Sequence, residues 1–111
     1  MMLAPSLPRG FTATKAVPLG TQGMPHVIKI VFYRVEAQPG AKWPNLKRPS
    51  DVWDFCYGLA GEMTMTLANK TNAAITPSTA FTFAAGSTTP LFANNTKHVT
   101  SYVCWEFLSK K

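Results

Sequence analysis

The sequence predicts a single all-β domain built as a sandwich, jelly roll or barrel. Short runs of β-branched and aromatic residues recur roughly every ten residues, with Gly, Pro and Asn between them. No window of useful length has the apolar period of a capped amphipathic helix. The chain has 111 residues, which is enough to bury one hydrophobic core and too few for two.

Residues 1–24 are expected to form an extended arm, and residues 25–111 the barrel domain. The first segment contains several proline and glycine residues, which disfavour a helix and favour turns. Such an arm commonly adds an edge strand to its own barrel or to a partner's barrel.

Three segments in the first two thirds of the chain have the strongest strand patterns. Residues 25–36 are β-branched and aromatic and end at the turn-forming residues 38–40, and residues 52–59 form the next such run. Apolar and polar side chains then alternate over residues 63–67, as in a half-buried strand. Gly61 lies between the second and third segments and predicts a hairpin there.

The last third of the chain predicts shorter strands and one long strand. Residues 69–71 and 86–89 are expected to be turns, and residues 80–84 a short aromatic strand before Leu91 and Phe92. The long strand covers residues 98–107. Strand alternation places five of its residues on one face: His98, Thr100, Tyr102, Cys104 and Glu106.

Composition argues against two kinds of partner. The net charge is +6, but the basic residues are scattered rather than gathered into a stripe, so nucleic-acid binding is not expected. No run approaches the roughly 18 apolar residues of a membrane span, and the start of the chain is broken by Pro5 and Pro8 rather than containing a signal-peptide core. We therefore expect a soluble, cytoplasmic protein without membrane partners.

The two cysteines, Cys56 and Cys104, lie in apolar strand-like runs rather than at the loop spacings of a metal knuckle. Buried free thiols are the favoured interpretation, and a disulfide between them is the alternative.

The order of turns and strands resembles the two-motif pattern of the cupin superfamily over residues 25–107. Gly40 and Gly61 match the ends of the first motif, and Gly86 and Asn94 match anchors of the second. The resemblance implies a cupin-type jelly-roll β-barrel. Glycine suits these motif positions because tight turns need backbone angles that other residues resist.

The chain departs from this family at the metal-binding positions. The two histidine positions of the first motif fall at about Leu46 and Arg48, and the glutamate position falls on Asp54. The histidine position of the second motif falls on Thr89 or Pro90. A transition metal needs about three or four converging nitrogen, sulfur or oxygen ligands, so neither a metal nor another cofactor is expected.

An alternative metal site, made from His26, His98 and Asp54 by rearrangement, is disfavoured but left open. His26 and His98 are the only histidines in the chain, and both are displaced from the family's ligand positions.

The candidate catalytic residues are Asp54 and His98. Alternation places Asp54 on the barrel-facing side of its strand, where partial desolvation raises a carboxyl pKa and suits the group to proton transfer. The simpler interpretation is that Asp54 pairs with Arg48 or caps a turn. His98 would act as an acid or base near neutral pH, unless it is an ordinary surface histidine.

A further set of residues is expected to bind the substrate. Arg48 would grip a carboxylate or phosphate, and aromatic side chains would form an apolar wall, although a barrel core needs such residues for packing in any case. The candidate binding residues are Arg48, Trp43, Cys56, Thr89, Phe92 and Tyr102.

Two classes of function remain open at this stage. The first is a metal-independent isomerase, epimerase or cyclase acting by proton transfer on a polar or anionic metabolite. The second is a non-catalytic barrel that binds or senses a small ligand with the same pocket. In either case an apolar outer face, formed by Val99, Val103, Trp105 and Phe107 or by the opposite set, and an open edge predict a homodimer.

Overall fold

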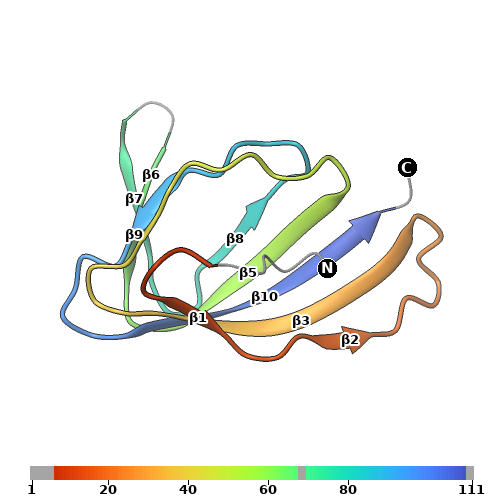
Figure 1. Cartoon of the computed structure of the whole chain (residues 1–111), viewed down its shortest axis with the longest axis horizontal. Coiled ribbons are helices and arrows are strands. Elements are labelled where there is room, and N and C mark those ends of the chain that lie inside the picture. Colours follow the sequence, from red (N-terminus) through yellow and green to blue (C-terminus); the bar gives the residue numbers. More distant parts are fainter. Residues whose placement is uncertain (1–6, 68–69, 110–111) are drawn as a thin grey trace.

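The strands of the computed structural model form two antiparallel β-sheets that face each other (Figure 1). The structure describes residues 7–67 and 70–109. Ten strands and no helix lie within these ranges, so the described part of the chain contains no helix able to cross a membrane. The prediction of an all-β jelly roll is confirmed.

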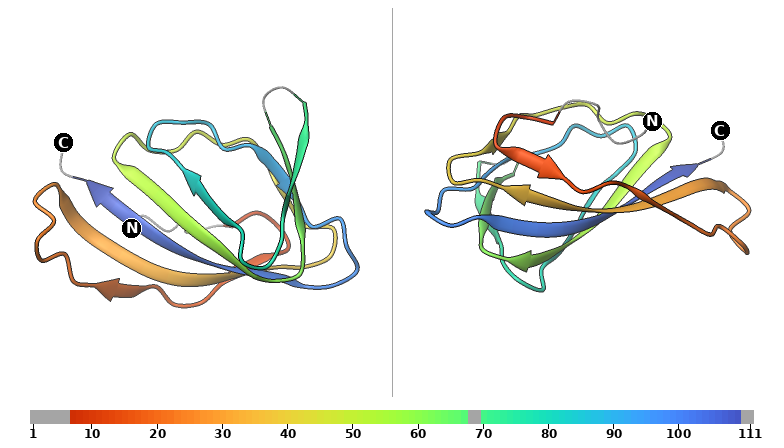
Figure 2. Two further views of the ribbon diagram at one scale, coloured as in Figure 1. Left: turned by 180° about the vertical axis from the view of Figure 1, so that it is seen from behind. Right: turned by 60° about the horizontal axis from the view of Figure 1, so that its bottom comes forward.

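The larger sheet, called the long sheet, has the order β1-β3-β10-β5-β8, with β2 also paired to β3. Its strands are β1 (Phe11–Ala13), β2 (Val17–Leu19), β3 (Val27–Ala37), β5 (Val52–Ala60), β8 (Ala80–Phe83) and β10 (Thr100–Ser109). The short sheet has the order β4-β9-β6-β7. Its strands are β4 (Lys42–Trp43), β6 (Met63–Thr66), β7 (Asn72–Ile75) and β9 (Leu91–Ala93). The short sheet covers one end of the long sheet, and the far ends of β3 and β10 extend beyond it (Figures 1 and 2).

Strand alternation determines which residues face the interior. Along β5, buried and exposed residues alternate from Val52 to Gly58, so Asp54 and Cys56 point inward while Trp53 and Phe55 point outward. The β5–β10 register pairs Asp54 with Glu106 and Cys56 with Cys104. Two acids and two thiols therefore share the inner face of the long sheet.

The expected hairpin across Gly61 is wrong, because β5 and β6 belong to different sheets and do not pair. Gly61 is where the chain passes from the long sheet to the short one. Its φ is +77°, and a Cβ at this position would lie 2.6 Å from Thr100 Oγ1 and 2.9 Å from Thr100 Cα. Backbone angle and space together explain a glycine there.

The N-terminal segment contributes strands that the sequence did not predict individually. Both β1 and β2 pair with the same edge of β3, so this part of the arm adds strands to its own sheet. Phe11 of β1 is buried in the core. The division into an arm (residues 1–24) and a barrel (residues 25–111) stays a prediction.

Asn94 and Gly40 join the ends of the two family-like motifs. Asn94 is fully buried, and its amide nitrogen donates to Ala37 O (3.0 Å) and His98 O (2.7 Å). Gly40 N donates to Asn94 O (2.8 Å), and Gly40 has a φ of +83°. Asn94 therefore has a structural role, tying the β3–β4 turn to the loop before β10.

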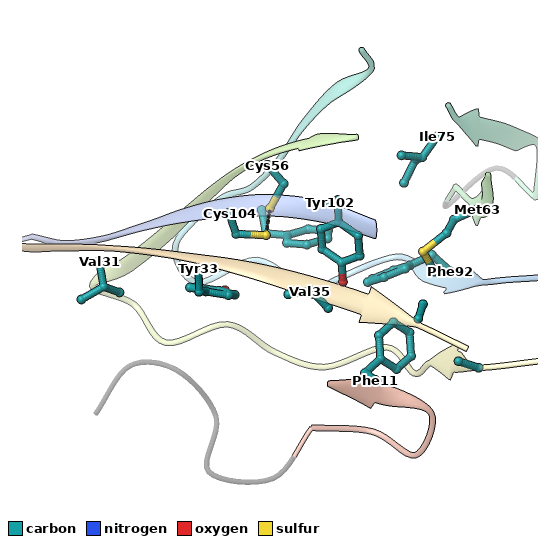
Figure 3. Close-up of a cluster of buried hydrophobic side chains, with 13 residues drawn as sticks. Phe11, Val31, Tyr33, Val35, Cys56, Met63, Ile75, Phe92, Tyr102 and Cys104 are labelled. Atoms are coloured by element: carbon teal, nitrogen blue, oxygen red, sulfur yellow. Dashed lines mark hydrogen bonds between the residues drawn. The ribbon is translucent and has the colours of Figure 1, made fainter. Parts of the chain in front are cut away.

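The core lies between the two sheets and receives side chains from both (Figure 3). Val31, Tyr33 and Val35 come from β3, while Met63 and Phe92 come from the short sheet. Each of these five residues is less than 10% exposed. Burial of this apolar surface holds the sheets together.

Candidate functional site

A cavity of about 290 Å³ opens on the inner face of the long sheet. Inward residues of β3, β5 and β10 line it, together with residues of β8, β9 and the connection between β4 and β5. Its polar lining comprises Tyr33, Lys47, Arg48, Asp54, Cys56, Thr89, Tyr102, Cys104 and Glu106. A mostly apolar pocket with a few convergent polar groups is typical of a small-ligand site.

Three charged side chains meet in this pocket. Arg48 forms an ion pair with Asp54 through its Nη2, and the same nitrogen lies 3.8 Å from Glu106 Oε1. The two carboxyl side chains are at most 5% exposed, and that of Arg48 is 16% exposed. One guanidinium therefore faces two buried acids.

The loop carrying Arg48 is fastened to the loop that precedes β9. Arg48 N donates to Ser87 O (2.7 Å), and Leu46 and Thr89 are joined twice, by Thr89 N to Leu46 O (2.7 Å) and by Leu46 N to Thr89 Oγ1 (2.9 Å). We call residues 44–50 and 84–90 together the rim loops. Their mutual hydrogen bonds hold Arg48 over the carboxyls.

Burial raises the pKa of both acids. Desolvation raises the pKa of Asp54 to about 6, against the opposing effect of the Arg48 charge and hydrogen bond. Desolvation and then the negative charge of Asp54 raise the pKa of Glu106 to about 7, while Arg48 lowers it. Both carboxyl pKa values therefore lie nearer to neutral pH than those of free carboxyl groups.

Several polar atoms of this pocket have no hydrogen-bond partner among the described residues. They are Trp43 Nε1, Arg48 Nε, Asp54 Oδ1 and Glu106 Oε2, and all four residues line the cavity. Buried polar groups in proteins nearly always have partners. These donors and acceptors are thus unpaired within the described residues and belong to side chains that line the cavity.

Aromatic side chains form the wall beside the charged groups. Trp43 stacks on Phe92, with ring centroids 5.4 Å apart and an interplanar angle of 12°, and Phe83 stacks on the same ring at 5.7 Å. Burial also raises the pKa of Tyr33 and Tyr102, which line the cavity and so keep their protons.

Most of the sequence-predicted residues come together here. Of the predicted binding residues, Trp43, Arg48, Cys56, Thr89, Phe92 and Tyr102 all line the cavity, as does Asp54. The Thr89 hydroxyl is occupied within the rim loops, since it also donates to Pro44 O (3.2 Å). Its role is to position the loop that carries Arg48.

His98 is not part of this pocket, which corrects its expected position on the last strand. That strand begins at Thr100, and His98 lies in the preceding loop with an exposed side chain. Its backbone carbonyl, which accepts from Asn94 and Thr96, fixes the loop instead. Glu106 was the residue missed: alternation had grouped it with Tyr102 and Cys104 on one face of the strand, and its cross-strand partner Asp54 was the signal that could have selected it.

The donor set does not fit the transition metal that the family resemblance implies. No three His, Cys, Asp or Glu side chains within residues 7–67 and 70–109 are grouped so as to hold a metal ion. His26 and His98 are both exposed, so the rearranged site with Asp54 does not form. The Arg48 guanidinium lies against both carboxyls, and its charge repels a cation from them.

Fold and site together define a jelly-roll protein with a charged pocket on the inner face of its long sheet. No family model matches the chain, and no curated protein does. Among similar solved structures is the Cupin_2 domain of an XRE family transcriptional regulator from Enterobacter cloacae, with a TM-score of 0.63 and 13% identity, covering 88% of this chain and 96% of that chain. The chain has the cupin fold.

Two further similar structures are named as enzymes. A cupin-superfamily sugar phosphate isomerase from Silicibacter pomeroyi has a TM-score of 0.65 and 18% identity over 88% of this chain. The polyketide cyclase RemF from Streptomyces resistomycificus has a TM-score of 0.67 and 15% identity over 90% of this chain. This chain spans 59% of the isomerase and 66% of the cyclase.

Proposed function

We propose that this protein is a metal-independent cupin that transfers protons on a small polar or anionic metabolite. The observation that supports it is the meeting of Arg48, Asp54 and Glu106 in one cavity, each with a polar atom unpaired within the described residues. The similarity to an isomerase and a cyclase is compatible with such chemistry but does not choose between them.

The two carboxyl groups have complementary roles in this proposal. Asp54, with a pKa of about 6, is the base and takes a proton from the substrate on Oδ1. Glu106, with a pKa of about 7, is the acid and gives its proton to the substrate. One proton leaves the substrate and one is returned, as an epimerisation or isomerisation next to a carbonyl group requires.

Arg48 binds and orients the substrate. Its Nε has no hydrogen-bond partner among the described residues and can donate to a carboxylate, a phosphate or a developing enolate oxygen. The guanidinium provides a fixed positive charge inside the pocket. The stacked Trp43 and Phe92 rings cover the apolar part of the ligand.

The experiment that tests this function is hydrogen exchange in D₂O. Sugar phosphates, α-hydroxy acids and β-keto acids are incubated with the protein, and deuterium entering carbon is followed by NMR and mass spectrometry. We expect exchange of at least one compound class, fastest between pH of about 6 and 7, where Asp54 is ionised and Glu106 protonated. Asp54→Asn and Glu106→Gln should each abolish it.

Two results would contradict the proposal. If the parent protein binds one of these compounds without exchanging it, the pocket is not catalytic. If elemental analysis of the purified protein finds a stoichiometric transition metal, the metal-independent mechanism is wrong. Exposed Glu62→Gln is the matched control, since it removes a carboxyl remote from the cavity lining.

The second candidate is a binding or sensory barrel without chemistry. It is favoured by the similarity to the cupin domain of a transcriptional regulator, of which this chain covers 96%. The same unpaired polar atoms would then hold a ligand. Tight binding with no exchange in D₂O is the result that distinguishes this role.

The cytoplasmic location stays a prediction, and we propose the predicted homodimer on a revised surface. Of the residues expected on its apolar face, Val99 lies in the loop before β10 and Val103 is buried. The outward residues of β3, β5 and β10 form an outer apolar face: Phe32, Trp53, Phe55, Tyr57, Leu59, Trp105 and Phe107. Trp53, Phe55 and Leu59 are each more than 40% exposed. An apolar face is self-complementary, so a second copy of the chain related by a two-fold axis suits it.

A further inference from the structure

We propose that Cys56 and Cys104 are a reversible modification site, at which a small oxidant entering the ligand cavity closes a disulfide between β5 and β10. This inference depends on the geometry of the two thiols and is independent of the proposed proton transfer. Both cysteines are free in this structure.

The two sulfurs are already placed for a bond. Cys56 and Cys104 are directly opposite each other in the β5–β10 register, and their side chains point to the same inner face. The Sγ atoms lie 2.6 Å apart (Figure 3). A disulfide needs about 2.05 Å between sulfurs and Cα atoms about 4.4–6.8 Å apart. Directly opposite residues of antiparallel strands have Cα separations of about 4.5–5.5 Å, which lies within the range that a disulfide needs.

The thiols are buried in the protein but face the cavity. Cys56 is 4% exposed and Cys104 is 3% exposed, yet both line the pocket that contains Arg48, Asp54 and Glu106. A small neutral oxidant such as hydrogen peroxide can approach through this cavity. Because both thiols are buried, cross-linking between molecules is disfavoured.

Burial determines how fast the reaction proceeds. It raises the pKa of the Cys56 thiol, and the neighbouring Cys104 and Asp54 raise it further, while Arg48 lowers it. The thiolate is the nucleophile, so oxidation should be slow at neutral pH and faster as the pH rises.

The reaction balances with peroxide as the oxidant. One thiolate attacks a peroxide oxygen, the O–O bond breaks, and a sulfenic acid and hydroxide are formed; the hydroxide takes up the proton that the thiol released and becomes water. The second thiol then attacks the sulfenic sulfur and releases a second water as the S–S bond forms. Two electrons pass from the two sulfurs to the peroxide, and a dithiol reductant reverses the change.

Closing the bond affects the strands that carry the two acids. Asp54 is two residues from Cys56, and Glu106 is two residues from Cys104. The bridge therefore fixes β5 to β10 beside the Asp54–Glu106 pair. It also links positions 48 residues apart in the sequence, which restricts the unfolded chain.

The test uses the full chain, reduced, freed of reductant and treated with hydrogen peroxide at about pH 8. We expect the intact mass to fall by about 2 Da, the mass of two hydrogen atoms, and both thiols to resist alkylation after denaturation. Peptide mapping should identify the Cys56–Cys104 cross-link, dithiothreitol should restore both thiols, and the oxidised form should melt at a higher temperature.

Single variants provide the comparison. Cys56→Ser and Cys104→Ser should each stop at a sulfenic acid that dimedone traps, with no loss of 2 Da. If either variant fails to fold, the intact mass, alkylation and peptide map of the parent protein test the inference on their own. Two alkylatable thiols in the oxidised parent, or cross-links only between molecules, would overturn the inference.

Discussion

Arg48 sets the charge balance of the pocket because its guanidinium lies beside both buried carboxyls. Arg48 lowers the pKa of Asp54 and of Glu106 while burial raises them. Removing the arginine would leave the carboxylate charges uncompensated in a buried site, where water solvates them poorly. The Arg48 side chain therefore influences the pKa of both acids.

Arg48→Gln should raise the pKa of Asp54 above its present value of about 6. It should also weaken binding of an anionic ligand by roughly tenfold to a hundredfold, the usual effect of losing a charge-assisted hydrogen bond. Carboxyl ¹³C NMR titration and calorimetry measure the two effects. Arg48→Lys, which keeps the charge, should restore part of the pKa effect.

Arg34→Gln is the matched control for this prediction. Arg34 lies on the outer face of β3 and pairs at 3.7 Å with Glu36, with both side chains about half exposed. Such a surface pair has little energetic effect. An unchanged Asp54 pKa in Arg48→Gln, or an equal change in Arg34→Gln, would contradict the role given to Arg48.

The raised carboxyl pKa values also make stability depend on pH. Asp54 and Glu106 have folded pKa values of about 6 and 7, above the ordinary values of 3.8 and 4.5. The folded state therefore binds more protons than the unfolded chain between these limits, and the free energy of unfolding should fall as the pH rises from about 4 to about 7.

Urea unfolding of the parent and of Glu106→Gln at pH values of about 4.5 and 7.5 checks this prediction. The neutral variant should lose part of the pH dependence, amounting to a few kcal/mol, since one pKa unit corresponds to about 1.4 kcal/mol. Glu62→Gln should keep the parental dependence. A free energy of unfolding that rises with pH for the parent protein over this range would contradict the prediction.

At the level of elements, alternation predicted the inner face of β5 and the grouping of residues on each face of β10, but not the path of the chain. Asp54 and Cys56 were placed correctly because burial on one side of a sheet imposes a period of two. The passage of β5 and β6 into different sheets was not predicted, since a glycine turn looks the same in a hairpin and in a crossing.

The sequence pattern also did not predict the shortest strands or the position of His98 outside β10. β4 has two residues and β2 has three exposed ones, so their pairing partners define them rather than their own composition. His98 was assigned to β10 because the apolar pattern does not show where a strand begins. The Arg48–Asp54 ion pair, in contrast, was one of the interpretations that the sequence offered for Asp54, and the structure contains it.

Gly61→Ala should lower the free energy of unfolding by roughly 2 kcal/mol or more. An alanine would have to adopt a φ of +77°, and its Cβ would lie within 3 Å of three atoms of Val99 and Thr100. Gly20→Ala is the control, because nothing lies within 4 Å of a Cβ there and its φ is not positive. Equal stability of the two variants in denaturant titrations would contradict this account of the crossing.

For the molecule as a whole, the two faces of the long sheet have different roles. The inner face carries the pocket, whereas the outer apolar face is rich in aromatic residues, of which Trp53, Phe55 and Tyr57 are exposed. Rings pair along this face, with Phe55 and Phe107 5.1 Å apart and Phe32 and Trp105 also 5.1 Å apart. An apolar surface of this kind in solution usually belongs to an interface.

The parent protein should sediment as a dimer, and Phe55→Glu should convert it to a monomer by placing a charge in the centre of the apolar contact. Analytical ultracentrifugation over a range of concentrations gives the answer. Val99→Glu is the control, since Val99 is as exposed as Phe55 but lies in the loop before β10. A monomeric parent at all concentrations would rule out this interface.

The fastening of the rim loops to each other has a consequence for how new specificity can arise. Arg48 lies outside the strands, on a segment secured by Ser87 and Thr89, whereas Asp54 and Glu106 belong to the paired core of the long sheet. Ligand preference can thus diverge by exchanging two short surface segments together, leaving the paired strands of the long sheet unchanged. Grafting such paired segments from other barrels is a direct route to engineering new selectivity on this scaffold.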